Sequence, residues 1–345
     1  MSKTVLGIDI GISSVRAVVL SHNQNPPKLV SIGKIASPQP GITSETDLDL
    51  DAVSAAIKAL IVEIKSPTKE AVVALPESKI FSRVIYDLPY LTNEELAQAI
   101  KFAAEEFVPM PIQDVNLNYQ VLFRSPQKGP NSRTVVYVVA SPKTLVEKYI
   151  RVLSNADIKP VAIETEIIAT SRALVNYSDY SPTTLIVQLN SLTTDFAVVA
   201  DGLVLLTRSI STGGMAMSRT IGQAFGFEMT QAEEYKKVYG LLENQLEGKL
   251  FQVLRPLIDI VISEAKRVIQ AHETQNPDKK IKRVVLSGGG AQLPGLVIYC
   301  ATALGLEVQE ADPWQAIAKD PNLKTKLSAE ASSYSLAVGL AMWQP

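Results

Sequence analysis

The 345-residue sequence has few side chains that could form cross-links or hold a metal: one cysteine, Cys300, and two histidines, His22 and His272. A single cysteine cannot form an intramolecular disulfide. The two histidines lie far apart in the sequence, which excludes a Cys/His metal site. Such sparse cysteine is typical of a reducing compartment, so we expect a cytoplasmic protein.

Long apolar runs and an excess of one charge are also missing. The N-terminal segment reaches Asp9 without the apolar region of a signal peptide, and no run approaches the roughly 18–20 residues of a membrane helix. The 33 basic and 35 acidic side chains give a net charge of −2, so no overall field attracts nucleic acid or an anionic membrane. We therefore expect no nucleic-acid partner and membrane association only through another protein.

The sequence does contain a strand–turn–strand pattern that occurs twice. Residues 5–9 and 15–20 predict two strands around a short turn, and residues 185–187 and 196–200 repeat that arrangement. Between them, a Thr92–Glu95 capping box begins a predicted helix, and further strands and a helix follow to about residue 161. We interpret the chain as a weakly duplicated α/β protein with a compact α+β insert.

The first turn combines small, polar and acidic residues. Gly11 lets the backbone approach a phosphate closely, and the hydroxyls of Ser13 and Ser14 can donate to its oxygens. Asp9, at the end of the strand, could hold a hydrated Mg²⁺. An ordinary hairpin turn is the alternative interpretation.

The second turn offers amides and hydroxyls in the same position. Gln188 stands where the first turn has its acid, and Asn190, Thr193 and Thr194 follow it. An amide can accept a hydrogen bond but brings no charge to a cation. This difference argues against efficient hydrolysis.

Two further segments are candidates for contacts with a nucleoside. Gly288, Gly289 and Gly290 between a strand and a helix would let the chain lie flat against a purine or sugar, although a structural turn remains the alternative. Glu233 and Lys236 could contact a ribose and a base. Alternatively, Thr230 and Glu233 form a capping box and Lys236 is solvated.

In this order, these segments resemble the actin-like superfamily and, more narrowly, the PilM family of type IV pilus assembly proteins, which is related to the cell-division protein FtsA. The resemblance covers essentially the whole chain. The segments that carry it are Gly7–Gly11, Leu88–Leu91, Glu95–Leu96, Ala99–Ile100, Glu105–Pro109, Asn118–Leu122, Gly213–Gly214, Ala232–Lys236, Gly288–Gly290, Leu293–Gly295 and Ala337–Ala341.

The resemblance implies an actin-like (ribonuclease H-like) two-lobe ATPase fold with an FtsA-type inserted α+β subdomain. The expected first lobe comprises residues 1–83 and 162–182, the insert residues 84–161 and the second lobe residues 183–330. Residues 331–345 are expected to form a helix that packs back on the first lobe.

The resemblance also assigns nucleotide contacts. It implies ATP or ADP with Mg²⁺, the metal held through water by Asp9. The implied nucleotide-binding residues are Asp9, Gly11, Ile12, Ser13, Ser14, Gln188, Asn190, Thr193, Thr194, Gly213, Gly214, Glu233, Lys236, Gly288, Gly289 and Gly290. The sequence departs from the family pattern at Gln188-Leu189-Asn190, where Asp-Ile-Gly is usual, and at Arg16, where Lys is frequent. We therefore expect nucleotide binding, Asn190 crowding the phosphate, and slow or absent hydrolysis, with no catalytic residue assigned.

The implied function is an adaptor at the cytoplasmic face of the inner membrane. It would bind the N-terminal cytoplasmic peptide of PilN and connect the inner-membrane complex to the pilus motor ATPases and the platform protein. The system could serve pili, DNA uptake or secretion, and a homo-oligomer is left open. The alternatives are an FtsA-like filament-forming membrane tether, which predicts a basic amphipathic C-terminal helix that the sequence does not show, and a small-molecule kinase, which needs a catalytic base.

Overall fold

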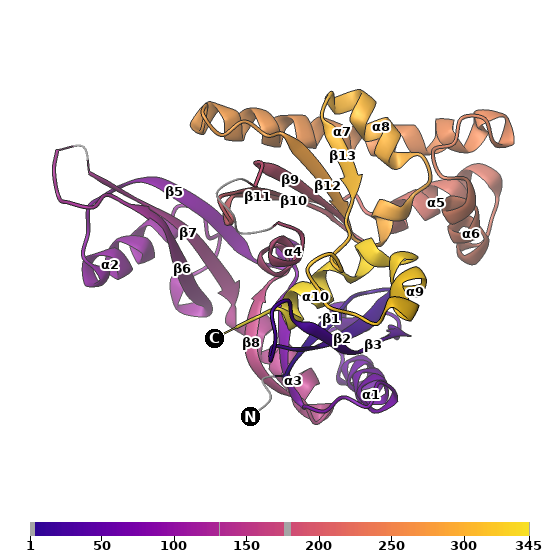
Figure 1. The fold of residues 1–345 in the computed structure, drawn as a ribbon, viewed down its shortest axis with the longest axis horizontal. Coiled ribbons are helices and arrows are strands. Elements are labelled where there is room, and N and C mark those ends of the chain that lie inside the picture. The colour runs from indigo at the N-terminus through magenta and orange to yellow at the C-terminus, as the bar shows by residue number, and fades with distance from the viewer. Residues whose placement is uncertain (1–3, 131, 176–180, 345) are drawn as a thin grey trace.

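A computed structural model describes residues 4–130, 132–175 and 181–344. Parts of the expected segments 1–83, 84–161, 162–182 and 331–345 (residues 1–3, 131, 176–180 and 345) lie outside the described residues. The described chain forms two lobes, each built on a five-stranded sheet, and a separate smaller sheet (Figure 1).

The sheet of the first lobe combines an antiparallel meander with two parallel strands. Its strands, in spatial order, are β3 (Lys28–Ala36), β2 (Ser14–Ser21), β1 (Thr4–Ile10), β4 (Glu70–Leu75) and β8 (Lys159–Thr165). The first three pair antiparallel, whereas β4 pairs parallel with both β1 and β8. The first predicted hairpin, with its turn between residues 10 and 14, is confirmed as β1 and β2.

The sheet of the second lobe has the same order and the same strand directions. Its strands are β11 (Leu203–Ile210), β10 (Thr194–Ala200), β9 (Thr184–Leu189), β12 (Arg283–Ser287) and β13 (Glu307–Glu310). Again the meander is antiparallel and the last two strands join it in parallel. The matching topology confirms the duplication that the two hairpins indicated.

Helices cover both faces of the first sheet. On one face, α1 (Asp47–Glu63) and α3 (Lys143–Asn155) pack on the alternate residues Leu6 and Ile8 of β1. On the other face lie α4 (Glu166–Leu174) and α10 (Ser335–Ala341). A Cβ on Gly7 would lie 2.4 Å from the Ala337 carbonyl oxygen, so this glycine lets α10 pack directly on β1.

The helices of the second lobe share one core with its sheet. They are α5 (Gly214–Phe225), α6 (Met229–Tyr239), α7 (Lys249–Gln275) and α8 (Leu296–Leu304). Apolar residues of α7, such as Leu254 and Ile258, pack on Phe196 and Val198 of β10. The short helix α9 (Lys324–Ser328) lies between the second lobe and α10 along the chain.

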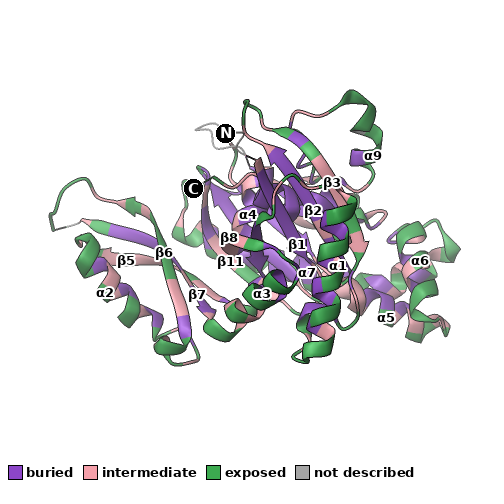
Figure 2. Ribbon diagram, turned by 90° about the horizontal axis from the view of Figure 1, so that it is seen from below, coloured by how far each residue is buried: buried purple, intermediate pink, exposed green. Residues whose placement is uncertain are grey.

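The insert is a three-stranded antiparallel sheet with one helix. Its strands are β5 (Phe81–Pro89), β7 (Arg133–Pro142) and β6 (Val115–Arg124), and α2 (Asn93–Ala104) covers one face. The predicted capping box is confirmed: Glu95 N donates to the Thr92 side chain (3.3 Å), and Thr92 N donates to the Glu95 carboxylate (2.8 Å). In Figure 2 the strands of the large sheets are mostly buried, while the insert is more exposed.

The small sheet and α2 occupy residues 81–142, whereas the expected insert was residues 84–161. The residues after Pro142 form α3, whose Val152 and Leu153 pack in the first-lobe core, and β8, which pairs with β4. The spacing of apolar residues predicts a helix here but does not say which sheet the helix covers. Among the described residues, no helix is both long and apolar enough to cross a membrane.

Candidate nucleotide-binding site

The two hairpin turns meet between the lobes. The Ser13 hydroxyl of the first turn and the Ser191 hydroxyl of the second turn are hydrogen-bonded at 2.6 Å. These residues are 178 positions apart in the sequence and belong to different sheets. The structure therefore brings together the two segments in which the sequence predicted phosphate contacts.

The first turn contains a buried acid and a basic partner. Asp9 of β1 is buried, with 8% of its surface exposed. Arg16 Nη1, on the neighbouring strand β2, donates to Asp9 Oδ2 at 3.2 Å. Burial raises the pKa of Asp9, and the charge and hydrogen bond of Arg16 oppose that rise. A Cβ on Gly11 would lie 2.8 Å from the Ser14 carbonyl oxygen, so the tight turn favours glycine.

The environment of Asp9 sets limits on a metal. Arg16 already binds its carboxylate, and no cluster of three or more His, Cys, Asp or Glu side chains within the described residues could hold a metal ion. Mg²⁺ usually keeps several waters and binds proteins through one or two carboxylates together with substrate phosphates. A single carboxylate, Asp9, fits a Mg²⁺ ion whose other ligands are water and nucleotide phosphates.

The amides of the second turn point to carboxylates. Gln188 Nε2 donates to Glu166 Oε2 at 3.2 Å, and Asn190 Nδ2 donates to the same oxygen at 3.2 Å and to Asp195 Oδ2 at 2.8 Å. Thr170 donates its hydroxyl proton to Gln188 Oε1 at 2.6 Å. The Asn190 side chain, which we expected to crowd a phosphate, is thus held by two acids.

These acids form a buried group that the sequence did not reveal. Burial raises the pKa of Glu77 to about 8 and the pKa of Asp195 to about 6, with the Asp195 charge also acting on Glu77. Burial and the charges of neighbouring acids raise the pKa of Glu166 well above its ordinary value. Glu166 follows strand β8 directly, and this position at a strand end was the available sequence signal.

Backbone groups attach the second turn to helix α5. Gly214 N donates to the Asn190 carbonyl at 2.9 Å, and Met215 N donates to the Ser191 carbonyl at 2.9 Å. A Cβ on Gly213 would lie 2.6 Å from the Leu192 carbonyl carbon, so this contact requires glycine. The positive end of the α5 dipole consequently lies at the second turn.

Thr193 and Thr194 are also held within the second turn. The Thr193 hydroxyl donates to Asp195 Oδ2 at 3.2 Å, and the buried Thr194 donates to the Thr212 carbonyl at 2.6 Å. In the first turn, Ile12 offers its carbonyl to Gln39 Nε2 at 2.8 Å. Both turns are therefore fixed by their own protein contacts.

Glu233 and Lys236 form an ion pair beside α5, with Lys236 Nζ 2.5 Å from Glu233 Oε2. The ammonium also donates to the Ser218 hydroxyl at 2.8 Å and the Gly214 carbonyl at 3.0 Å. The alternative interpretation was a capping box of Thr230 and Glu233 with a solvated Lys236. It is wrong on both points, because α6 begins at Met229 without a side-chain cap and Lys236 is only 8% exposed. Burial lowers the pKa of Lys236, against the raising effect of Glu233.

The three-glycine loop lies against the end of β9. Gly288 has φ +81° and a Cβ there would lie 2.5 Å from the Leu189 carbonyl oxygen, while a Cβ on Gly290 would lie 2.7 Å from the Leu189 side chain. A Cβ on Gly289 would have no atom within 4 Å. The loop therefore packs on the end of β9 through Gly288 and Gly290 and leaves open space at Gly289.

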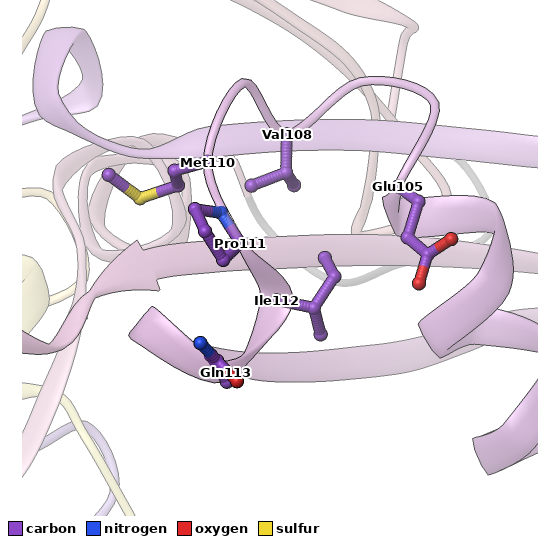
Figure 3. Close-up of a pocket in the computed structure, with 6 residues that line it drawn as sticks. All are labelled: Glu105, Val108, Met110, Pro111, Ile112 and Gln113. Carbon is purple, nitrogen blue, oxygen red and sulfur yellow. The ribbon is translucent and has the colours of Figure 1, made fainter.

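A separate cavity lies in the insert (Figure 3). Its volume is about 420 Å³, and its lining residues are Glu105, Val108, Met110, Pro111, Ile112 and Gln113. It is close to the start of β6, where Val115 pairs with Pro142 immediately before α3. The cavity therefore lies at the end of the insert that joins the first lobe.

Two lobes of the same sheet topology that meet at paired hairpin turns define the actin-like class of folds. The chain belongs to the family described as type IV pilus assembly protein PilM, whose family model matches residues 7–344. It is 21% identical over 371 residues to the cell division protein FtsA of Neisseria meningitidis serogroup B, covering 96% of this chain and 88% of that protein.

Solved structures agree with this assignment. The chain is similar to the protein in the PilM–PilN type IV pilus biogenesis complex, with 25% identity, a TM-score of 0.86 and coverage of 98% of this chain and 97% of that one. The ethanolamine utilization protein EutJ of Carboxydothermus hydrogenoformans shares the fold, with a TM-score of 0.60 and 16% identity over 100% of this chain and 91% of that one. MreB 5 of Spiroplasma citri, solved bound to AMPPNP, also shares the fold, with a TM-score of 0.56 and 13% identity over 98% of this chain and 95% of that one. The family and the fold expected from the sequence are confirmed.

Proposed function

We propose that this protein is a nucleotide-binding adaptor of type IV pilus assembly that holds the N-terminal cytoplasmic peptide of a PilN-type membrane protein. The observation that carries the proposal is the similarity to the protein of the PilM–PilN complex, which extends over 98% of this chain and therefore includes the insert. The partner would place the protein at the cytoplasmic face of the inner membrane. Pilus motor ATPases and the platform protein are further proposed partners.

The nucleotide is ATP or ADP. The contact between Ser13 and Ser191 supports a phosphate site shared by both lobes, and the open surface at Gly289 supports a nucleoside beside it. Glu233 and Lys236 supply a charged pair at the rim of α5. Asp9 would hold Mg²⁺ through water, and the ion would supply positive charge against the phosphates.

The proposed role of the nucleotide is structural, with slow or absent hydrolysis. Arg16 neutralises Asp9, and Gln188 carries no charge at the matching position of the second turn. Glu166 accepts hydrogen bonds from both turn amides, and burial and the charges of neighbouring acids raise its pKa. Asp195, whose pKa burial raises to about 6, already accepts hydrogen bonds from Asn190, Thr193 and Ser209.

The proposed peptide site includes the cavity of the insert. Apolar side chains of Val108, Met110 and Ile112 line it, and Glu105 adds a negative charge at its edge. The pocket is open to the surface and combines these apolar side chains with polar groups, so we propose that it receives side chains of an extended peptide. A peptide bound there would lie where the insert joins the first lobe.

The test is a calorimetric titration with the cytoplasmic N-terminal peptide of the PilN-type protein encoded in the same genome, with a scrambled peptide as control. We expect saturable binding of the native peptide and a loss of at least about tenfold in affinity for Met110→Glu. The matched control is Met229→Glu, because Met229 is an exposed methionine of the second lobe. Absence of binding to the correctly folded protein would refute the adaptor function.

A further inference from the structure

Strand β6 is a free edge of the small sheet. It pairs with β7 on one side, while the opposite edge of this sheet, β5, contacts β11 of the second lobe (Figure 1). In the described part of the chain, no backbone hydrogen bond from outside the sheet reaches residues 116–124. The outer N–H and C=O groups of this strand can therefore pair with a further strand.

The residues of β6 do not protect this edge. Residues 115–123 contain no charged side chain, glycine or proline, and their valines and aromatic residues favour strands. Tyr119, Val121 and Phe123 are 39%, 37% and 47% exposed. A bulge lies between Val121 and Phe123, so residues 115–121 keep a regular ladder with β7. A long, regular and uncharged edge of this kind can accept a further strand.

The other sheet edges of the described structure are covered or interrupted. On β3, Leu29 N donates to the Ala318 carbonyl at 2.9 Å. On β11, the Leu205 carbonyl accepts from the Tyr86 hydroxyl of β5 at 3.0 Å. Strand β8 contains Pro160, and β13 is only 4 residues long. Covering segments, proline and short length are ways in which sheets avoid pairing with other chains, and β6 has none of these among the described residues.

The side-chain pattern of β6 is complementary to itself in an antiparallel arrangement. Leu117 packs in the core beneath α2, and by strand alternation Tyr119 and Val121 lie on the same face of the sheet. When two copies of β6 pair antiparallel about Tyr119, Leu117 of one copy lies opposite Val121 of the other. The amides of Asn118 and Gln120 then lie opposite each other on the second face. Apolar side chains therefore meet apolar ones, and amides meet amides.

The two ends of β6 carry opposite charges that form no ion pair in the described chain. Asp114 immediately precedes the strand, and Arg124 ends it. The hydrogen bond of Arg124 is to the neutral amide of Asn93, at 3.0 Å, so its charge is not compensated there. In the antiparallel register about Tyr119, Asp114 of one copy comes near Arg124 of the other at both ends of the contact. Parallel pairing in register would instead bring like charges together.

We propose that β6 is a dimerisation edge: a second copy of this chain adds its own β6 antiparallel, so that the two small sheets join into one. The contact needs neither nucleotide nor peptide, and it goes beyond the proposed adaptor function. A two-fold contact uses the same surface of both copies, so it closes at a dimer and builds no filament. One strand pair buries a small area, so we expect reversible association with a Kd on the order of 10 µM.

Sedimentation velocity of the full chain measures this association. Between about 1 and about 200 µM we expect the wild type to change from monomer to dimer. Tyr119→Lys places two ammonium groups opposite each other at the two-fold axis and should weaken dimerisation at least about tenfold. The matched control is Val30→Lys, at a position 48% exposed on the edge strand β3, which should dimerise like the wild type.

Exchanging the charges at the ends of the strand tests the register. Asp114→Lys or Arg124→Glu alone would place like charges together at both ends, so each should weaken the dimer about fivefold or more. The double variant Asp114→Lys/Arg124→Glu restores opposite charges in the antiparallel dimer and should return the affinity to within about twofold of the wild type. Recovery in the double variant cannot result from misfolding, because that variant carries both changes.

Hydrogen exchange locates the contact without any substitution. In the wild type, amides within residues 116–121 should exchange more slowly at high than at low protein concentration, while those of β3 should not change. Three results would each overturn the inference: a wild type that stays monomeric at the highest concentration, a dimer that Tyr119→Lys leaves intact, or a double charge variant as weak as the single ones. Growth beyond a dimer would also contradict it.

Discussion

The two hairpin turns have matching strand pairing but hold their acidic side chains in different ways. In the first, the acid is at the end of the strand, where Arg16 binds Asp9. In the second, the strand ends in the amide of Gln188, and the acids Glu166 and Asp195 lie behind the turn. The comparison shows that the two turns share their strand pairing and differ in where their carboxyl groups lie relative to the end of the strand.

The largest expected effect comes from filling the contact between the second turn and α5. A Cβ on Gly213 would lie 2.6–2.7 Å from backbone atoms of residues 190–192, so Gly213→Ala should destabilise the protein by about 3 kcal/mol and displace the turn. Urea denaturation and ATP titration would measure both effects. Gly129→Ala is the control, because a Cβ there meets no atom within 4 Å. Equal stability of the two variants would contradict the account.

The acids near the second turn should make stability depend on pH. The pKa of Glu77 is raised from 4.5 to about 8, so the folded protein retains a proton that the unfolded chain releases. Rising pH therefore lowers the free energy of unfolding between those two values. Glu77→Gln should reduce the stability difference between about pH 5 and about pH 8 by roughly 2 kcal/mol.

Urea denaturation at the two pH values would test this. Glu307→Gln, at an exposed strand position, provides the control and should keep the wild-type pH dependence. An equal response of Glu77→Gln and wild type would show that Glu77 is not protonated in the folded protein.

A charge placed in the glycine loop at residues 288–290 should weaken nucleotide binding without destabilising the protein. The Gly289 position is open, so Gly289→Asp should change the free energy of unfolding by less than about 0.5 kcal/mol. Its carboxylate would lie in the space proposed for the nucleoside, where it would lose hydration and repel the negatively charged nucleotide, so ATP binding should weaken at least about tenfold, or about 1.4 kcal/mol. Gly289→Asn has the same shape without the charge and should bind more tightly than Gly289→Asp. Unchanged ATP affinity of the aspartate variant would remove this loop from the site.

The smallest effect concerns the direct contact of the turns. Removing either hydroxyl, in Ser13→Ala or Ser191→Ala, should cost about 1 kcal/mol or less in stability, because the hydrogen bond is exposed. A double-mutant cycle should give a coupling of a few tenths of a kcal/mol. Strictly additive effects would mean that the turns do not interact in solution.

Local patterns predicted much of the fold, and tertiary contacts account for most of what was missed. The capping box at Thr92 was identifiable because both partners lie within one turn of helix. The same pattern at Thr230 is misleading, since Ser218 and Lys236 compete for Glu233 and only the folded protein brings Ser218 there.

The acids behind the second turn could not be assigned from the sequence for a similar reason. Glu166 is 24 positions from Asn190, and the two meet only because β8 and β9 end at the same place between the lobes. The position of α3 was missed because its apolar spacing suits either sheet, and its partner α1 is far away in the sequence. The hydrogen bond between the Ser82 and Thr207 hydroxyls likewise joins residues 125 positions apart, in β5 and β11 of two different sheets.

The central claim is that the turns of the two lobes together hold the phosphates of a nucleotide. The most direct test is a crystal structure of the protein with Mg-AMPPNP. The account predicts phosphate density in contact with Ser13 of the first turn and with residues 190–193 of the second, and the nucleoside beside Gly289. A nucleotide bound elsewhere, or an unchanged contact between Ser13 and Ser191 with no ligand at saturating concentration, would contradict it.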